Sequence, residues 1–316
     1  MRTSTKKNCL LCGNFALDTI VTREYPDGFI IGKRNNHFVE RVAVESVGNT
    51  CGNVAAILPY LGVKSYPIAH LDLSEQGLKI KEDLQRYGAD VRFVENSENG
   101  GTTLLRCTHK RDKMTGEHTT SFRATSPGSR FPKRRFIRLR DEAPAFIEAL
   151  DFVPDVFFFD AAEAGLRYLA SELHQRGTLV YFEPESDAEK SKFQKAVEVS
   201  HIVKFSHEKV KDVSFISQHT DKLFIRTMGA EGLEFNLCGQ GWVNVAPVPN
   251  DNVVDWEGAG DWTTSQFIAC LCERDILSIA KMTTDNIREC LERACKTASR
   301  SVSYLGSKGM IDAEKQ

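Results

Sequence analysis

The second half of the chain alternates short apolar runs with amphipathic stretches, and no other feature of the sequence constrains the fold as strongly. Four apolar runs have the length of buried strands: residues 155–160, 178–184, 200–205 and 221–227. Helical patterns separate them at residues 163–177, 187–199 and near 207–218. Strands joined through helices run parallel with right-handed crossovers, so we expect one layered α/β domain around a mostly parallel sheet.

The first half predicts further core elements and a small second sheet. Residues 8–15 have the pattern of a short buried strand, and residues 46–62 that of a Gly/Asn-rich loop that leads into a short helix. Residues 75–88 predict an amphipathic helix, followed by a strand at 89–94. The remaining patterns indicate an exposed strand and a hairpin that would form the small sheet: residues 37–45, 101–109 and 118–124.

A glycine turn beside an aspartate is the strongest functional signal. Within residues 251–272 (DNVVDWEGAGDWTTSQFIACLC), an apolar strand-like run ends at Val254 and helical spacing begins at Asp261. A strand, a turn of small residues and a helix N-terminus together present free backbone N–H groups and a positive dipole end to an anion. Asp261 would either cap this helix or accept a proton from a hydroxyl that attacks a phosphate.

This stretch resembles the C-terminal signature of the PfkB, or ribokinase-like, family of carbohydrate and nucleoside kinases, which is approximately D-T-x-G-A-G-D followed by a helix. Trp256 replaces the usual threonine. The resemblance implies that Asp261 is the catalytic base and that the three residues before it form the anion hole. The matching positions are Asp255, Gly258, Ala259, Gly260 and Asp261.

Residues 46–62 resemble the N-terminal signature of the same family, G-G-x-x-x-N-x-A-x-x-L-x-x-L-G. Gly48 and Asn53 match, whereas Asn49 replaces the second glycine, on which the family's lid rotates. Asparagine tolerates positive φ better than other non-glycine residues. Gly13 and Asp18 keep the family's G-x-x-x-x-D spacing, so the resemblance implies that Asp18 and Asn53 hold the acceptor. Without it, Asp18 would be a turn aspartate bonded to local backbone.

The nucleotide side of the family pattern is less complete. Thr227, Gly229 and Gly232 resemble a T-x-G-x-x-G turn that contacts nucleotide phosphates, although a turn with two glycines also suits a hairpin. Residues 204–208 stand where the family has a P-N-x-x-E segment that organises Mg²⁺, with Glu208 as the candidate glutamate. Glu183 and its neighbour Glu185 replace a D-x-N segment; carboxylates suit Mg²⁺, and they equally suit a solvated surface.

Composition and charge argue against nucleic-acid-binding and membrane proteins. With 41 Lys and Arg against 43 Asp and Glu, the net charge of −2 calls for neither nucleic acid nor an anionic membrane. No apolar run is long enough to span a bilayer, and no signal peptide is recognisable, so we expect a cytoplasmic protein. The basic stretch 130–140 is interpreted as a solvated face or linker; a second hypothesis is that the basic lid favours an anionic acceptor.

Nine scattered cysteines argue for buried free thiols rather than for a metal site. Cys9 and Cys12 form a C-x-x-C pair, but in a strand their side chains would face opposite ways. No second C-x-x-C or nearby histidine pair accompanies them, so a zinc site is not expected.

The combined hypothesis is an α/β, ribokinase-like fold: a three-layer α/β/α core with a mostly parallel central sheet plus a small β-sheet lid. A single domain would cover residues 1–316, with lid segments at about 19–46 and 95–125. The resemblance implies an ATP- and Mg²⁺-dependent kinase that phosphorylates a hydroxyl of a small sugar-like acceptor. Lids in this family sometimes pair between subunits, so a homodimer through the lid is one of the oligomeric states left open. The alternatives are a nucleoside kinase of the family and a family member that binds ligand without catalysis. A nicotinamide dehydrogenase is set aside because no early G-x-G-x-x-G is present.

Overall fold

The protein is described by a computed structural model over residues 6–24, 39–111, 118–125, 136–138 and 142–315. Within these residues a central sheet of nine strands has the order β13-β12-β11-β10-β9-β8-β1-β4-β5. The pairings from β5 to β11 are parallel, and β11, β12 and β13 pair antiparallel. The strands are β1 (Asn8–Cys12), β4 (Lys64–Leu71), β5 (Val94–Asn96), β8 (Val156–Phe159), β9 (Leu179–Phe182), β10 (Ile202–Ser206), β11 (Leu223–Thr227), β12 (Leu233–Leu237) and β13 (Trp242–Val245).

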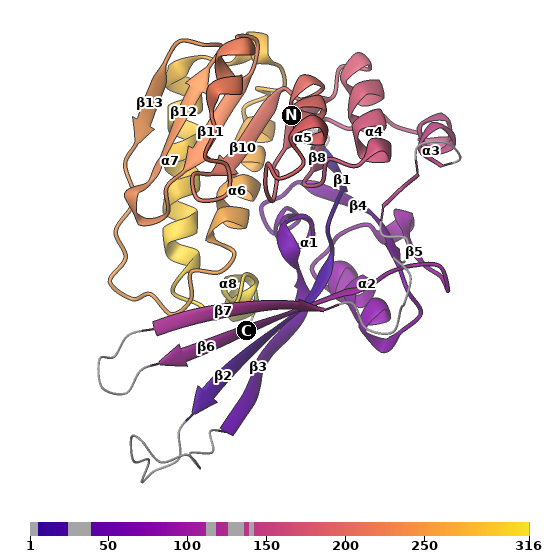
Figure 1. The fold of residues 1–316 in the computed structure, drawn as a ribbon, viewed down its shortest axis with the longest axis vertical. Coiled ribbons are helices and arrows are strands. Elements are labelled where there is room, and N and C mark those ends of the chain that lie inside the picture. The colour runs from indigo at the N-terminus through magenta and orange to yellow at the C-terminus, as the bar shows by residue number, and fades with distance from the viewer. Residues whose placement is uncertain (1–5, 25–38, 112–117, 126–135, 139–141, 316) are drawn as a thin grey trace, which may run out of the picture.

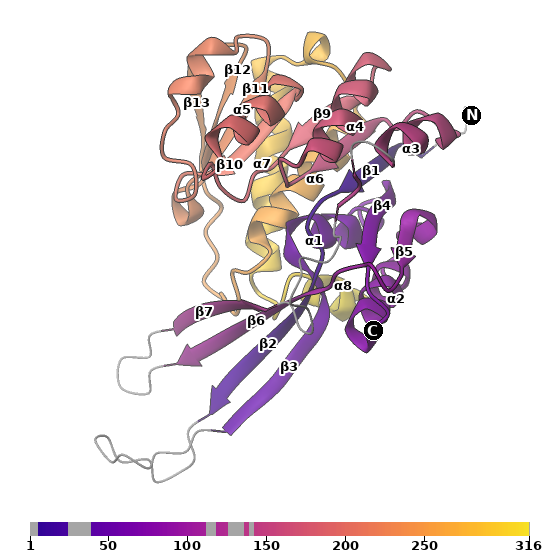
Figure 2. The same ribbon diagram turned by 45° about the vertical axis from the view of Figure 1, so that its right-hand side comes forward.

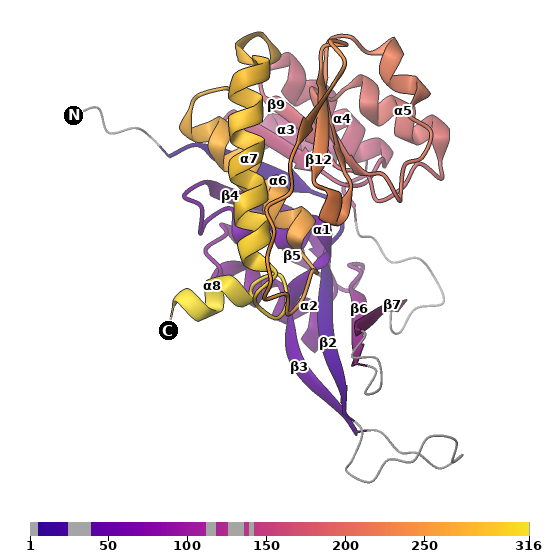
Figure 3. The same cartoon turned by 90° about the vertical axis from the view of Figure 1, so that its left-hand side faces the viewer.

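Helices cover both faces of this sheet, as Figures 1 and 3 show. One apolar cluster contains Cys9 and Leu11 of β1 and the inner faces of five helices, whereas a second contains Leu10 and Cys12 and the inner faces of three others. Alternate residues of a strand point to opposite faces, which is why the two thiols of the C-x-x-C pair lie in different clusters. The first set is α1 (Asn49–Ile57), α2 (Glu75–Arg86), α6 (Ala259–Glu273), α7 (Thr284–Ser301) and α8 (Gly309–Glu314); the second is α3 (Ala143–Ala149), α4 (Ala164–Gln175) and α5 (Lys190–Glu198).

A second sheet of four strands, called here the small sheet, extends away from the central sheet at one end of the molecule (Figures 1 and 2). Its order is β3-β2-β6-β7, formed by β2 (Ala16–Glu24), β3 (Val39–Gly48), β6 (Thr103–Arg111) and β7 (His118–Thr125). The predicted hairpin is confirmed, because β6 and β7 pair antiparallel. The predicted basic stretch 130–140 lies mostly outside the described residues.

Three local predictions are wrong. The residues before Gly258 form no strand: β13 ends at Val245, and Val253 and Val254 are exposed in a loop. The stretch near 207–218 is a turn followed by a short 3₁₀ segment at Ser214–Gln218, and the strand expected at 89–94 is a 3₁₀ turn, Val91–Phe93, ahead of β5. Apolar spacing over so few residues does not separate strand, helix and loop.

The cysteine prediction is wrong at one pair. Cys270 of α6 and Cys290 of α7 form a disulfide, and the other seven cysteines are free. The spacing of the nine cysteines did not reveal this pair, because it forms only where α6 and α7 pack side by side.

Candidate active site

The N-terminus of α6 lies at the centre of the candidate site. Gly258 is its N-cap residue and has a left-handed φ of 77°. A Cβ at this position would overlap Ser307, so glycine is required both by the backbone conformation and by the close approach of residue 307. No side-chain hydrogen bond caps this helix. Asp261 lies in its first turn, and the hydrogen bond shown for its carboxylate comes from Asn53, which favours a chemical over a capping role.

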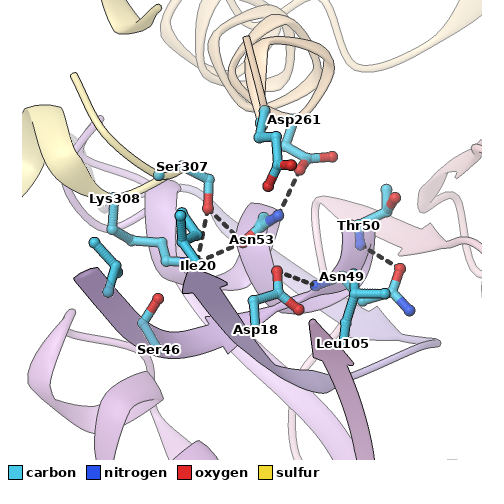
Figure 4. Close-up of a pocket in the computed structure, with 14 residues that line it drawn as sticks. Asp18, Ile20, Ser46, Asn49, Thr50, Asn53, Leu105, Asp261, Ser307 and Lys308 are labelled. Atoms are coloured by element: carbon cyan, nitrogen blue, oxygen red, sulfur yellow. Dashed lines mark hydrogen bonds between the residues drawn. The ribbon is translucent and has the colours of Figure 1, made fainter. Parts of the chain in front are cut away.

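A chain of hydrogen bonds fixes the orientation of Asp261 (Figure 4). Asn53 of α1 donates from Nδ2 to Oδ2 of Asp261 at 2.6 Å. The Oδ1 atom of Asn53 accepts from Ser307 Oγ at 2.8 Å and from Lys308 Nζ at 2.6 Å. Because Lys308 has only donors, Asn53 must turn its carbonyl to the lysine and its NH₂ group to the aspartate.

Burial tunes the pKa of Asp261. Removal of the carboxylate from water, with the negative charge of Glu183 nearby, raises its pKa to about 7. The hydrogen bond from Asn53 and the charges of Lys204 and Lys308 act in the opposite direction. A carboxyl group with a pKa near neutral pH is suited to accept a proton from a substrate hydroxyl.

The helix that holds Asn53 is itself fixed by a buried aspartate. Asp160 follows β8 and accepts hydrogen bonds from the backbone N–H groups of Asn14 at 2.8 Å and of Cys51 at 2.9 Å. Its carboxylate lies so close to Gly13 that a Cβ there would overlap it. Asp160 thus joins the loop after β1 to the first turn of α1, and Gly13 has a packing role.

Asp18 of β2 lies against the backbone at the start of α1. Its Oδ2 accepts a hydrogen bond from the backbone N–H of Asn49 at 3.2 Å, while its Oδ1, shielded from solvent, has no partner among the described residues. Burial raises the pKa of Asp18 to about 6. A Cβ on Gly48 would overlap the Asp18 carboxylate, which explains the glycine. Asn49 has a φ of 61°, so it occupies the left-handed conformation that a glycine would otherwise supply.

A cavity of about 180 Å³ connects these groups. Asp18, Asn49, Asn53 and Asp261 all line it, together with apolar side chains of the small sheet (Figure 4). We call it the first cavity; its described lining is Asp18, Ile20, Val44, Ser46, Asn49, Thr50, Asn53, Leu105, Glu257, Gly258, Asp261, Gly306, Ser307 and Lys308.

A second cavity of about 220 Å³ lies on the other side of Asp261, and Thr50, Gly258 and Asp261 line both. Its described lining is Thr50, Glu183, Pro184, Lys204, Phe205, Ser206, Lys209, Thr227, Gly258, Gly260 and Asp261. Thr50 comes from α1, and Gly258, Gly260 and Asp261 come from the start of α6. The other residues lie at or just beyond the carboxyl ends of β9, β10 and β11, the edge at which open α/β sheets bind ligands. Two lysines beside a helix N-terminus give this cavity the chemistry of an anion site.

Lys204 is the central cation of the second cavity. It is buried on β10, forms an ion pair with Glu183 and donates to the carbonyl of Gly260 at 3.2 Å. Thr264 of α6 donates to the second oxygen of Glu183 at 2.5 Å. A buried lysine is costly unless it is paired, so these contacts both retain the charge and hold it beside the glycine turn.

Of the other residues predicted to bind the nucleotide or the metal, only Thr227 belongs to the described lining of the second cavity. Gly229 and Gly232 lie in the tight turn between β11 and β12. A Cβ on Gly232 would contact the backbone of Val245 and Pro247, so this glycine has a packing role. Glu208 is exposed and is absent from the described lining, whereas Lys209 is present.

The described residues contain no group of three His, Cys, Asp or Glu side chains placed to hold a metal ion. Mg²⁺ commonly keeps several waters and is held through one or two carboxylates plus substrate phosphates. Glu183, a hard oxygen donor beside the two lysines, fits an ion that arrives with a nucleotide. No helix among the described residues is long and apolar enough to cross a bilayer.

The lining residues that the sequence analysis missed include Lys204, Glu257, Ser307 and Lys308. Lys204 carried a signal, because a lysine within an apolar strand must be paired when it is buried. Ser307 and Lys308 lie just beyond the end of α7, and Glu257 lies inside the recognised signature. For these three, no pattern in the sequence indicated that Ser307 and Lys308 contact Asn53 or that Glu257 contacts Cys107.

Comparison with known proteins agrees with this geometry. The sequence matches the family model described as "pfkB family carbohydrate kinase" over residues 29–314. No curated protein matches it. Among solved structures, a microbiome-derived acarbose kinase is similar, with a TM-score of 0.71 and 16% identity over 96% of this chain and 95% of the other. A ribokinase from Arabidopsis thaliana, solved with ribose and ATP, gives 0.67 and 16% over 99% and 100%. A nucleoside kinase from Methanocaldococcus jannaschii gives 0.65 and 16% over 99% and 100%.

Proposed function

Because the chain belongs to the pfkB family of carbohydrate kinases, we propose that it transfers the γ-phosphoryl group of ATP to a hydroxyl of a sugar or sugar derivative. The observation that supports this most directly is the position of Asp261. It lies in the first turn of α6, has a pKa of about 7, and lines both the first cavity and the lysine-containing second cavity.

In this proposal each cavity has one role. The acceptor occupies the first cavity, where the unpartnered Oδ1 of Asp18 is available to a hydroxyl. The nucleotide phosphates lie toward the second cavity, near Lys204, Lys209 and Thr227. Mg²⁺ would neutralise phosphate charge when it is bound with the nucleotide, with Glu183 as the nearby carboxylate.

The chemistry follows from the hydrogen-bond pattern of Asp261. Asn53 binds Oδ2, which leaves Oδ1 to accept the proton of the attacking hydroxyl. The backbone N–H groups at the N-terminus of α6, around Gly258, Ala259 and Gly260, face the charge that develops on the transferring phosphoryl group. Asn53 and Lys308 keep the carboxylate oriented throughout.

Two alternatives to a sugar kinase are a nucleoside kinase and a family member without catalytic activity. A nucleoside acceptor is consistent with the similarity to a nucleoside kinase, and nucleosides therefore belong in the test. A non-catalytic family member is disfavoured by the raised pKa of Asp261, since the free energy of burying a carboxyl group has no evident use in a binding protein.

The test is ATP consumption with Mg²⁺ across a panel of sugars, sugar acids, phosphosugars and nucleosides. We expect one acceptor to react, and Asp261→Asn to lower kcat by about 10²- to 10⁴-fold because the proton acceptor is lost. ATP affinity should survive in this variant. The matched control is Asp251→Asn, at an exposed position seven residues before the N-cap, which should keep the wild-type rate.

Thermal unfolding separates loss of chemistry from loss of folding. The pKa of Asp261 is raised in the folded protein, so unfolding releases a proton between about pH 4 and 7 and this group lowers the free energy of unfolding as pH rises. Asp261→Asn removes that penalty, and its melting temperature at pH 8 should equal or exceed that of wild type. Full turnover in a folded Asp261→Asn variant would rule out the proposed base.

A further inference from the structure

The first cavity contains more acidic groups than the proposed base and its acceptor-binding partner require. Glu257 joins Asp18 and Asp261 in the described lining, so three carboxylates face one small space. Burial raises the pKa of Glu257 to about 7, and the neighbouring charges of Asp255 and Asp18 act in the same direction. Three carboxylates that line one small cavity disfavour the entry of a further negative charge.

Lys308 is the one cationic side chain in the described lining of this cavity, and it has no donor left for a ligand. It is 3% exposed. Its ammonium group donates to the carbonyl of Val47, to Asn53 Oδ1 at 2.6 Å and to Ser307 Oγ at 2.7 Å. An ammonium group has three N–H donors, so an anionic substituent on the acceptor would find no direct partner here.

Glu257 is held firmly in place by its neighbours. Its backbone N–H donates to Asp255 Oδ1 at 3.0 Å, and the other oxygen of Asp255 accepts from the N–H of Gly306 at 2.9 Å. Its Oε1 accepts a hydrogen bond from the thiol of Cys107 on β6. The carboxylate therefore has a fixed position where the loop before α6 meets the small sheet, and its Oε2 has no hydrogen bond shown to the described residues.

We propose that the first cavity selects an acceptor without an anionic group, and that Glu257 is a specificity-determining residue that binds a hydroxyl or ammonium donor of that acceptor. This inference rests on the proposed function and narrows its substrate class to neutral or amino-substituted polyhydroxyl compounds. Sugar acids and phosphosugars are disfavoured, contrary to the hypothesis that a basic lid favours an anionic acceptor. Like charges facing each other in a half-buried site are a strong basis for rejection.

The experiment compares four forms of one carbon skeleton at pH 8, in hexose and pentose series: the free sugar, its 2-amino-2-deoxy analogue, its aldonic acid and its monophosphate. The value of kcat/KM for each is measured with wild type, Glu257→Gln and Glu82→Gln. Glu82 is an exposed glutamate of α2 outside both cavities, so its variant is matched for charge change. In parallel, the shift in melting temperature that each compound causes in Asp261→Asn reports binding without turnover.

For wild type we expect the neutral or amino-substituted form to exceed the acid and the phosphate in both kcat/KM and thermal shift. Glu257→Gln should reduce that preference about tenfold or more, because it removes one of the facing charges while it keeps the side-chain shape. Glu82→Gln should leave the preference unchanged. If Glu257→Gln loses only the preference for the amino-substituted form, Glu257 binds an ammonium group of the acceptor. If it loses the preference for the neutral and the amino-substituted form equally, Glu257 binds a hydroxyl group.

Three results would overturn the inference: an acid or phosphate preferred by wild type, an unchanged preference in Glu257→Gln, or no binding by any neutral or amino-substituted compound. Failure of the proposed function gives a different result. Neutral compounds would then shift the melting temperature with the predicted selectivity, but no ATP would be consumed.

Discussion

At the scale of single residues, the site depends on acidic side chains held away from water. Asp18, Glu257 and Asp261 all have raised pKa values, and burial is the largest cause for each. Asn53 and Lys308 keep Asp261 oriented, and both partly offset the effect of burial on its pKa. A change at any of these positions should therefore appear in the pH dependence or in the Michaelis constants before it appears in the fold.

The pH profile tests Asp261 directly. A base must be ionised to accept a proton, so kcat/KM should rise with pH through a midpoint near 7, the pKa of this group. Asn53→Ala removes the hydrogen bond that favours the carboxylate, so the midpoint should move to higher pH. Initial rates measured from pH 5.5 to 9 provide both values. A midpoint that stays in place or moves to lower pH in Asn53→Ala would contradict this account.

Gly48 provides a test of Asp18. A Cβ at position 48 would overlap the Asp18 carboxylate, so Gly48→Ala should displace that group and raise the KM for the acceptor about tenfold or more, at a steric cost of about 1–3 kcal/mol. The KM for ATP should change little, because neither residue lines the second cavity. Gly177→Ala is the control: it strains a φ of 86° but meets no atom within 4 Å, so it should cost stability without changing either KM. Equal changes in both Michaelis constants for Gly48→Ala would argue against a specific role of Asp18.

At the scale of elements, the start of α1 and the pairing of α6 with α7 determine where the functional groups lie. The left-handed Asn49 joins β3 of the small sheet directly to α1, which holds Asn53. Asn49 Oδ1 also accepts from the N–H of Thr50 at 2.8 Å, so asparagine supplies both the backbone conformation and a hydrogen bond that glycine would lack. The departure from the second family glycine therefore preserves the turn.

A titration of free thiols tests the disulfide between α6 and α7. Of the nine cysteines, seven are free, so denatured protein without reductant should titrate as seven thiols and reduced protein as nine. Reduction should also lower the melting temperature, since closing a loop of 20 residues stabilises a protein by about 3 kcal/mol in the chain-entropy treatment. Nine thiols without reductant would instead support the free thiols expected from the sequence.

At the scale of the whole molecule, the small sheet extends from the α/β core beside the first cavity, to which it contributes Ile20, Val44 and Leu105. Its outer strands are β3 and β7. An edge strand has unpaired backbone groups and is a natural site for association with another chain. This arrangement supports the expectation that two copies associate through the small sheet.

Light scattering tests the dimer. Two chains of 35.4 kDa give 2 × 35.4 = 70.8 kDa, and we expect this mass at micromolar concentration. Val42 of β3 is 63% exposed, so Val42→Lys should shift the mass toward that of one chain, because it places a charge in the proposed contact. Lys195→Glu on α5, an exposed position on a helix of the α/β core, is a control that should leave the mass unchanged. A wild-type mass of one chain at all concentrations would contradict the prediction.

The sequence by itself predicted the alternating strands and helices of the α/β core, three strands of the small sheet, and Asp18, Asn53 and Asp261 as candidate site residues, because periodicity, glycine turns and signature spacing are local properties of the chain. It did not predict β2, β4, β12 or β13. Tertiary structure alone decided which groups complete the site. Lys308 and Glu257 meet Asn53 and Cys107 across sequence separations of 255 and 150 residues. The pairing of Cys270 with Cys290 and the raised carboxyl pKa values have the same origin. Each depends on which side chains packing brings together and on how far it excludes water, and neither quantity is encoded in a local pattern.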